Sequence, residues 1–212
     1  MSDIWLLMRS GGGEASWNMA VDEALLSEVD RIGVPIVRCY SWSEPAASFG
    51  YFQRHADIVE ATDLRPLVRR CTGGGLVPHD NDWTYSVVFP PGHEWFGVRA
   101  EVSYRRIHEW IAGAMIQMGL PAELAAASEA LGSGRCFAGY ERFDVLQSGR
   151  KIAGAAQRRN RRGLLIQGSI QLPEAIDRER WAECFLRFGQ KTFAIEWREM
   201  ESDAAMVSVA ER

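Results

Sequence analysis

Lysine is rare in this chain, and one of its two lysines lies in a segment that indicates chemistry. The 212 residues contain 24 lysines and arginines, of which only Lys151 and Lys191 are lysines. Lys151 lies in the glycine-flanked segment 149–154, which reads Gly-Arg-Lys-Ile-Ala-Gly. An ammonium is a compact point charge, whereas a guanidinium is a planar fork that suits bidentate partners. We therefore interpret Lys151 as a ligand contact, although an arginine bias with Lys151 on the surface explains the same count.

A second group of chemically capable residues surrounds a glycine triplet. It comprises two arginines, three glycines, a histidine and an aspartate: Arg69, Arg70, Gly73, Gly74, Gly75, His79 and Asp80. Consecutive glycines allow positive φ angles and let backbone N–H groups approach a ligand closely. Arginines at the start of the loop neutralise an anion or pair with carboxylates. A flexible turn explains a lone triplet equally well, as at residues 11–13, but the charged flanks make this loop a more specific prediction of substrate binding.

The composition describes a folded chain and argues against several classes of function. Hydrophobic residues make up 47% of the sequence and charged residues 25%, which is typical of a protein with a substantial core. The formal net charge of −4 argues against a general nucleic-acid binder, which needs a broad basic surface. No apolar stretch approaches the roughly 18 residues of a transmembrane helix, so we expect no membrane partner. Residues 1–9 have the features of neither a signal peptide nor an anchor.

The four cysteines indicate a reducing environment. Cys39, Cys71, Cys136 and Cys184 are widely spaced and form no Cys-x-x-Cys pair. Such a pattern predicts free thiols in the cytoplasm and no structural zinc or other metal site.

The apolar patterns predict the elements that position these residues. Helices are expected at residues 15–30, 102–118 and 177–188, where apolar positions recur at helical spacing. Strands are expected at residues 4–8, 36–42, 46–52, 83–89, 143–146, 151–157 and 164–172. Turns are expected at residues 11–13 and at the arginine-rich segment 158–163.

Together these elements predict an α+β fold with a mixed, mostly antiparallel sheet against which helices pack. No repeat or interdomain linker interrupts the pattern. We therefore expect one domain over residues 1–190, followed by a weakly patterned C-terminal tail over residues 191–212.

Both glycine-containing segments resemble the signatures of one enzyme family. Residues 69–80, Arg-Arg-Cys-Thr-Gly-Gly-Gly-Leu-Val-Pro-His-Asp, resemble the glycine-rich signature of the lipoate–protein ligase and octanoyltransferase family. Residues 149–157, Gly-Arg-Lys-Ile-Ala-Gly-Ala-Ala-Gln, resemble its second signature, which carries the essential lysine of the family. Segments 18–25 and 49–53 also match, so the resemblance spans about residues 5–172 in family order.

This resemblance implies a fold, an activity and a set of partners. The implied fold is the catalytic domain shared with biotin–protein ligases, and the implied activity attaches octanoyl or lipoyl to a lysine of a lipoyl carrier domain. Ligases of the family use ATP and Mg²⁺ to make an acyl-adenylate. Transferases take octanoate from the thioester of acyl carrier protein and require no cofactor. The implied partners are acyl carrier protein, a lipoyl domain or glycine cleavage H protein, and octanoate or lipoate.

Cys136 favours the transferase route. It lies in Arg-Cys-Phe-Ala at residues 135–138, 15 residues before Lys151, and resembles the Cys-Phe element that holds the nucleophile in a cysteine-dependent octanoyltransferase group. A thiolate exchanges readily with a thioester, and the cations of Arg135 and Lys151 would stabilise it. Lys151 is the second expected catalytic residue, because its ammonium can stabilise the oxyanion of a tetrahedral intermediate. The alternative for Cys136 is a buried structural cysteine.

The remaining cysteines and the histidine of the first signature have weaker signals. Cys39 and Cys184 are expected in the core, and Cys71 is a rival nucleophile at a position where the family has no catalytic thiol. His79 is a candidate general base because imidazole titrates near neutrality, but the resemblance favours a role in organising the loop. Asp80 is expected to orient His79 or, in a ligase, to bind Mg²⁺.

Other substrate contacts are expected in the matched segments. Tyr51 and Gly154 are expected to contact the substrate. Candidates for the wall of an acyl tunnel, each of which also fits the core, are Trp42, Phe49, Tyr51, Phe52 and Trp83. The four arginines within residues 158–162 form either a solvated turn or a docking patch for acidic carrier proteins.

Two departures from the family pattern bear on the choice of activity. Gln167 stands where the family often has histidine in Gln-His-Gly-Ser. The chain ends about 40 residues after this strand, without the accessory C-terminal domain of many ligases, which weakens the ligase hypothesis. The sequence therefore predicts a cysteine-dependent octanoyltransferase. The alternatives are an ATP-dependent lipoate–protein ligase and a non-catalytic acyl-binding relative.

Overall fold

A computed structural model describes residues 3–129, 139–171 and 176–200, which contain five helices and eleven strands. The helices are α1 (Ala15–Ile32), α2 (His55–Ala61), α3 (Glu94–Gly97), α4 (Ala100–Gln117) and α5 (Arg178–Phe193). The strands are β1 (Asp3–Gly13), β2 (Ile36–Trp42), β3 (Ala46–Phe49), β4 (Leu67–Arg69), β5 (Val77–His79), β6 (Trp83–Phe89), β7 (Glu123–Leu124), β8 (Val145–Gln147), β9 (Arg150–Asn160), β10 (Gly163–Ile170) and β11 (Ile195–Glu199).

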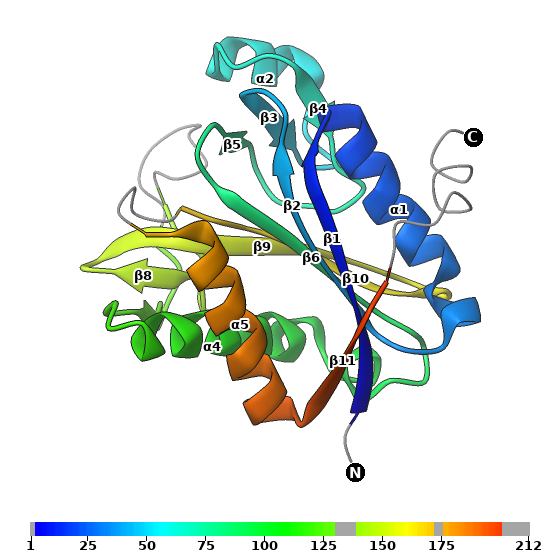
Figure 1. The fold of residues 1–212 in the computed structure, drawn as a ribbon. Coiled ribbons are helices and arrows are strands. Elements are labelled where there is room, and N and C mark those ends of the chain that lie inside the picture. The colour runs from blue at the N-terminus through cyan, green and yellow to red at the C-terminus, as the bar shows by residue number, and fades with distance from the viewer. Residues whose placement is uncertain (1–2, 130–138, 172–175, 201–212) are drawn as a thin grey trace.

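Helices cover both faces of a large sheet (Figure 1). This sheet has eight strands in the order β11-β1-β2-β6-β10-β9-β8-β7. Helix α1 packs on one face, whereas α4 and α5 pack together on the other. A second sheet of three strands, β4-β3-β5, lies beside α1. The small sheet and the large sheet together form the walls of the site described below.

The sequence patterns predicted most of this architecture. The α+β class is confirmed, and the large sheet is mixed but mostly antiparallel, because only the two pairings of β1 are parallel. Strands β2 and β6 begin and end at the predicted residues, and helices α1 and α4 lie within two residues of prediction.

The turn predicted at residues 11–13 is wrong, because a strand continues through it. Strand β1 includes the glycines 11–13, and its register with β2 shifts between Arg9 and Gly12. Gly11 has a φ angle of 56°, so a glycine absorbs this irregularity within the strand instead of ending it. Strand β9 extends to Asn160 and pairs with β10 from Gly163, so the predicted turn within residues 158–163 is confirmed but is limited to Arg161 and Arg162.

The described residues after position 190 are part of the fold. The predicted boundary at residue 190 falls inside α5, which continues to Phe193. Strand β11 then pairs in parallel with β1 at the edge of the large sheet. Ile195 is buried and Trp197 is partly buried against the core, but a strand of five residues offers only these two apolar positions by which to predict it.

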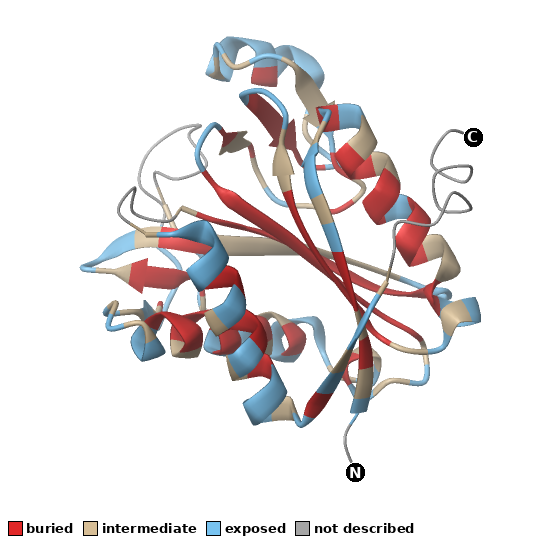
Figure 2. Ribbon diagram, viewed as in Figure 1, coloured by how far each residue is buried: buried red, intermediate tan, exposed pale blue. Residues whose placement is uncertain are grey.

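Burial from both faces explains the continuous apolar character of the central strands. Every residue of β6 and β10 is buried (Figure 2). Strands covered on both faces lose the alternation of apolar and polar residues that marks a half-exposed strand. The polar residues that remain within them must therefore be satisfied by other buried groups.

The face of the sheet beneath α1 contains such a buried polar network. Arg38 on β2 and Asp22 on α1 are both fully buried, and Arg38 Nη1 lies 2.8 Å from Asp22 Oδ1. Arg38 Nη2 donates to Asn18 Oδ1 at 2.8 Å, Ser86 Oγ donates to Asp22 Oδ1 at 2.8 Å, and Tyr40 OH donates to Asp22 Oδ2 at 3.0 Å. Asn18 and Asp22 are four residues apart and thus share one face of the helix. The contacts of Asn18 and Asp22 with Arg38 give a structural reason for these two polar residues in segment 18–25, which resembles the family pattern.

Replacing Arg38 with methionine should leave the Asp22 carboxylate buried without its cation. We expect the free energy of unfolding to fall by about 3–5 kcal/mol, measured by urea denaturation. Arg31→Met is the matched control, because the pair of Arg31 with Glu28 is largely exposed on the arginine side and should contribute about 0–1 kcal/mol. Equal losses in the two variants would contradict the importance assigned to the buried pair.

Candidate active site

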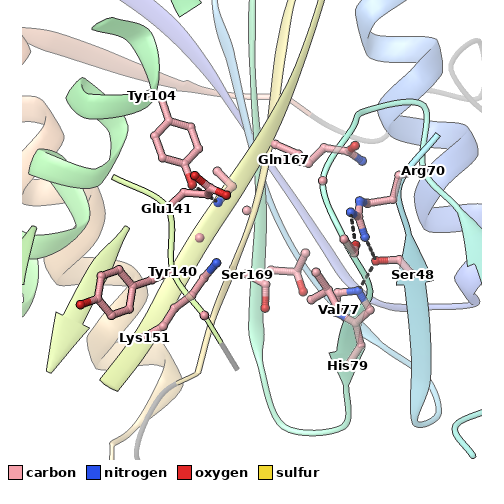
Figure 3. A pocket seen from close by; sticks show the side chains of 18 of the residues that line it. Ser48, Arg70, Val77, His79, Tyr104, Tyr140, Glu141, Lys151, Gln167 and Ser169 are labelled. Atoms are coloured by element: carbon pink, nitrogen blue, oxygen red, sulfur yellow. Dashed lines mark hydrogen bonds between the residues drawn. The ribbon is translucent and has the colours of Figure 1, made fainter. Parts of the chain in front are cut away.

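A cavity of about 430 Å³ lies between the large sheet and the three-stranded sheet (Figure 3). Ser48 and His79 line it from the small sheet, whereas Ser169 and Lys151 line it from β10 and β9. Tyr104 reaches it from α4. The volume is within the usual range for small-molecule sites. Segments far apart in the sequence therefore meet around one space that could hold a small substrate.

A transverse row of residues forms the floor of the cavity. The strand registers place Gly154 beside Ser169, Ser169 beside Thr84, and Thr84 beside Tyr40. All four residues line the cavity. The floor thus crosses four strands, beginning near Lys151 on β9 and ending at β2.

Lys151 lies on the cavity wall in an ion pair with a buried carboxylate. Its Nζ is 2.7 Å from Asp144 Oδ2, and Asp144 is fully buried while Lys151 is slightly exposed to the cavity side. A Cβ atom on Gly154 would lie 2.7 Å from Lys151 Cε and 2.9 Å from Nζ. Lys151 and Gly154 thus pack against one another, and only glycine leaves room for the ammonium.

An irregularity in the sheet brings these two residues to the same face. Side chains alternate between faces along a strand, so positions three apart ordinarily point in opposite directions. Here Leu146 pairs with Lys151 but Val145 pairs with Ala153, so β9 contains one extra residue. Both Lys151 and Gly154 consequently line the cavity. This register shift accounts for the spacing of the second signature.

Arg70 supports the glycine loop from within. Its Nη1 donates to Ser48 Oγ at 2.7 Å, and its Nη2 donates to the carbonyl oxygens of Gly73 at 3.0 Å and Gly75 at 2.7 Å. The conformation of the loop also requires Gly74, which has a φ angle of 82°. Arg70, Gly74 and Gly75 line the cavity, and the guanidinium fixes the shape of that wall.

The glycine loop is also tied to the buried network beneath α1. Thr72 Oγ1 donates to Gln167 Oε1 at 2.7 Å. The amide nitrogen of Gln167 then donates to Asp22 Oδ2 at 2.7 Å. Gln167, which stands where the family often has histidine, therefore joins the loop to the core. It also lines the cavity.

His79 belongs to a buried chain of hydrogen bonds whose acid is Asp82. Its Nδ1 lies 2.8 Å from Asp82 Oδ2, and its Nε2 lies 2.6 Å from Ser48 Oγ. Asp80, the predicted partner, is exposed, so the prediction that Asp80 orients His79 is wrong. The serine–histidine–aspartate order resembles a hydrolytic triad, but Arg70 also donates to the serine oxygen. With both ring nitrogens engaged and Trp42 stacked at 3.9 Å between centroids, His79 organises the wall, as the sequence analysis favoured.

Two predicted substrate contacts are directed away from the cavity. Arg69 donates from Nη1 to the carbonyl oxygens of Tyr51 at 2.8 Å and Gln53 at 2.6 Å, so it braces the turn after β3. Tyr51 is 49% exposed on that turn, and neither residue is among those that line the cavity. Gly73 supports the loop through its carbonyl, whereas Gly154 lies at the cavity as predicted. The strand was predicted to reach residue 52, and its earlier end at Phe49 explains the difference.

Only one of the proposed tunnel aromatics lines the cavity. Trp42 does so, with its indole N–H donating to Thr84 Oγ1 at 2.9 Å. Phe49 and Trp83 are buried in hydrophobic clusters, and Phe52 is 88% exposed. For Trp42, Phe49 and Trp83, the face of the strand on which each residue lies decides the outcome, and the sequence alone does not indicate which face borders the cavity.

The described cysteines lie outside the cavity. Cys39 is buried in the core, as expected, and Cys184 is partly buried on α5. Burial, with the nearby carboxylates of Glu23 and Asp22, raises the pKa of the Cys71 thiol to about 12. Cys71 is therefore a poor source of thiolate at neutral pH.

The predicted nucleophile Cys136 lies outside the described residues. Its segment leaves the described chain after Glu129 and rejoins it at Gly139, and both of these residues line the cavity. The backbones of Glu129 and Tyr140 exchange hydrogen bonds of 2.8 and 3.0 Å. The two ends of the segment are thus held together at the cavity wall.

The buried acids and the tyrosine around Lys151 and His79 were not predicted from the sequence. Asp144 stands between Phe143 and Val145 in a predicted strand, and an ionisable residue in an apolar strand is a signal of a paired charge. Asp82 directly precedes the apolar strand β6 in a similar way. Tyr104 has no comparable signal, because a tyrosine on an amphipathic helix usually packs in the core.

The arginine-rich segment 158–162 does not form a single patch. Arg158 donates to the carbonyl oxygen of Cys71 at 3.0 Å, beside the glycine loop. The guanidinium of Arg159 lies over the ring of Phe96, 5.3 Å from its centroid, near α4. Neighbouring residues of a strand face opposite sides of the sheet, so the cluster in the sequence is divided in space.

Within residues 3–129, 139–171 and 176–200, no three His, Cys, Asp or Glu side chains gather in positions that could hold a metal ion. No helix in these ranges is both long and apolar enough to span a membrane.

Comparison of the chain with known proteins gives one consistent family. The family described as the lipoyl protein ligase A/B catalytic domain matches residues 14–191. Octanoyltransferase LipM of Kyrpidia tusciae is 38% identical over 187 residues, which cover 81% of this chain and 68% of the relative. Octanoyltransferase LipM of Staphylococcus aureus is 33% identical over 183 residues, which cover 80% of this chain and 66% of the relative. The chain thus spans about two thirds of the length of these relatives.

Solved structures confirm the expected fold. A lipoate-protein ligase A bound with ATP has a TM-score of 0.79 and 21% sequence identity, and the match covers 100% of this chain and 93% of that chain. The Thermoplasma acidophilum protein Ta0514, a putative lipoate protein ligase with bound lipoic acid, has a TM-score of 0.77 and 20% identity, covering 100% of this chain and 94% of that chain. At identities this low, the structural similarity shows the fold alone. With the two signatures assembled on opposite walls of one cavity and the family match across residues 14–191, the chain belongs to the lipoyl protein ligase A/B catalytic domain family.

Proposed function

We propose that this chain is an octanoyltransferase that moves an octanoyl group onto a lysine of a lipoyl carrier domain. The relatives named octanoyltransferase LipM support the choice of octanoyl transfer. The observation that carries the proposal is the ammonium of Lys151, which an ion pair with Asp144 holds on the wall of a cavity of about 430 Å³. A compact charge at this position fits an acyl carbonyl, and the cavity beyond it fits an acyl chain.

Lys151 acts as an electrostatic catalyst in this proposal. When a nucleophile attacks the acyl carbonyl carbon, negative charge develops on the carbonyl oxygen. The ammonium of Lys151, positioned before the reaction by Asp144, donates a hydrogen bond to that oxygen. Catalysis follows because this interaction is stronger in the transition state than in the bound substrate.

Cys136 is the proposed nucleophile of the first step. Its Sγ attacks the carbonyl carbon of an octanoyl thioester, and the bond from that carbon to the donor sulfur breaks. The donor leaves as a thiol, which carries the proton that the Cys136 thiol has lost. The cavity supports this assignment because Gly139, three residues after Cys136, lines it. Three residues of chain span at most about 11 Å.

The second step transfers the octanoyl group from Cys136 to the acceptor. The neutral ε-amine of the acceptor lysine attacks the thioester carbon, the carbon–sulfur bond breaks, and Cys136 is regenerated. The nitrogen loses one proton as the amide forms. A thioester is already activated toward an amine, so this route requires neither ATP nor Mg²⁺, which the alternative ligase route would need.

The partners of the reaction follow from the same chemistry. We propose acyl carrier protein as the donor, because it carries octanoate as a thioester, and a lipoyl domain or glycine cleavage H protein as the acceptor. A cytoplasmic location, where carrier proteins and free thiols occur, stays a prediction of the cysteine pattern.

Intact-protein mass spectrometry tests the thioester intermediate directly. Mixing the chain with octanoyl acyl carrier protein should add one octanoyl group, and peptide mapping should locate it on Cys136. Cys136→Ala should abolish both the adduct and the transfer, whereas Cys71→Ala should retain both because its thiol has a pKa of about 12. Unchanged octanoyl transfer by Cys136→Ala would contradict the cysteine mechanism.

Assays of pyrophosphate release and of ligand binding separate the alternative functions. Release of pyrophosphate that depends on ATP and lipoate, with no adduct from the carrier, would establish a ligase. Tight binding of octanoate or lipoate without turnover on any carrier would identify a non-catalytic relative.

Replacing Lys151 tests its proposed contact with the carbonyl oxygen. Both Lys151→Met and Lys151→Arg should lower the single-turnover transfer rate by about a hundredfold or more, as expected for loss of an oxyanion donor. Arginine should not substitute, because its planar fork does not fit beside Gly154. Lys191→Arg, an exposed change in the last turn of α5, should leave the rate unchanged. A fully active Lys151→Arg would contradict the argument from shape.

Gly154→Ala tests the position of the ammonium without removing it. The new Cβ would lie 2.7 Å from Lys151 Cε and must displace the side chain. A shift of about 1 Å in a catalytic group costs about a hundredfold in rate, so we expect a loss of that order with the fold retained by circular dichroism. Gly92→Ala is the control, because its Cβ would meet no atom within 4 Å.

A further inference from the structure

Tyr104 is a cavity residue that belongs to neither family signature. It lies on α4 and reaches the cavity from the same side as Lys151 (Figure 3). Its hydroxyl donates a hydrogen bond to Asp144 Oδ1. The ammonium of Lys151 lies 2.7 Å from Oδ2 of the same carboxylate. One carboxylate thus joins the phenol of Tyr104 to the ammonium of Lys151.

Both oxygens of Asp144 are engaged by fixed groups. Oδ1 accepts from Tyr104, and Oδ2 accepts from the backbone N–H of Glu141 at 2.8 Å as well as from Lys151. The Asp144 side chain is fully buried, so loss of a donor would leave a carboxylate oxygen unsatisfied at considerable cost. The carboxylate therefore has one favoured orientation, which gives the ammonium one favoured position.

The phenol that sets this orientation is itself held in place. The Tyr104 ring meets His108 edge-on, with 4.3 Å between centroids, and the backbone N–H of Ala155 points to the phenol oxygen at 3.5 Å. Burial and the Asp144 carboxylate raise the pKa of Tyr104 well above its ordinary value. Burial lowers the pKa of His108 to about 4. At neutral pH the tyrosine therefore keeps its proton to donate, and the histidine beside it is uncharged.

We propose that Tyr104 is a positioning residue for Lys151: by occupying Oδ1 of Asp144, it confines the ammonium to Oδ2, on the side of the cavity. The inference rests on the proposed function, in which that ammonium meets the acyl carbonyl oxygen. An ammonium has three donors. Without the hydroxyl, Oδ1 of the same carboxylate is left unsatisfied, and the ammonium moves to bridge both oxygens. The substrate oxygen then loses a donor although Lys151 is still present.

Tyr104→Phe tests this inference, because it removes the hydroxyl and keeps the ring against His108. We expect the single-turnover rate of octanoyl transfer to fall about tenfold, the factor typical of a lost hydrogen bond to a charged group. The KM for the acceptor domain should stay within about twofold, because the acceptor does not depend on Asp144 for binding.

A second readout reports on Lys151 without reference to activity. The chain has two lysines, so brief treatment with a water-soluble acetylating reagent and peptide mass spectrometry gives the ratio of labelling at Lys151 to that at exposed Lys191. An ammonium that bridges both oxygens of Asp144 is less available to the reagent. Tyr104→Phe should therefore lower this ratio by a factor comparable to the loss of rate.

Tyr85→Phe is the matched control. Tyr85 is also a buried tyrosine, and among the described residues its hydroxyl has no hydrogen-bond partner. Its loss should change neither the rate nor the labelling ratio.

The two readouts together decide between the possible results. A lower rate with an unchanged labelling ratio, or no change in either, would overturn the positioning role of Tyr104. A lower ratio with an unchanged rate would support the positioning of Lys151 by Tyr104 and contradict the proposed catalytic contact of Lys151. The failure of this inference is therefore distinguishable from the failure of the proposed function.

Discussion

Asp22 and Arg38 form an ion pair that is completely enclosed between helix α1 and the large sheet. Enclosing two charges is unfavourable unless every remaining donor and acceptor is satisfied. The second oxygen of Asp22 accepts from Gln167, whose carbonyl oxygen accepts from Thr72 in the glycine loop. The position of the loop at the cavity thus depends on a pair in the core. A change at the pair should act on both stability and the site.

Two further buried carboxylates organise the rest of the cavity in the same way. Asp82 accepts from Ser169 and faces Nδ1 of His79, so it fixes the floor and the wall opposite Lys151. Asp144 fixes the wall that carries Lys151. Each acid lies behind the surface of the cavity and presents other residues to it. The protein thereby builds a polar site in which both of these buried carboxylates are hydrogen-bonded before a substrate arrives.

The sequence predicted the residues that form the surface of the site better than the groups that hold them. Lys151, Arg70 and the glycines stand in compact segments, so local patterns identify them. Asp82 and Asp144 act through partners that only the strand registers bring together, so their importance is invisible in a linear pattern. Tyr51 shows the opposite error, because it stands in a matched segment but lies on an exposed turn outside the cavity. The fold class was predictable because apolar periodicity survives in most elements, whereas the short edge strand β11 offers only two apolar positions, Ile195 and Trp197.

The scarcity of lysine acquires a physical meaning from these contacts. Arg38, Arg69 and Arg70 each donate hydrogen bonds to three or more groups at once, which a planar guanidinium with five donors does well. They act as braces between segments. The space beside Gly154 and Asp144 instead admits a narrow side chain that ends in a single charge. We expect an arginine there to meet Gly154 or to turn its guanidinium away from the cavity, so the tight space beside Gly154 favours the cation that this chain otherwise rarely uses.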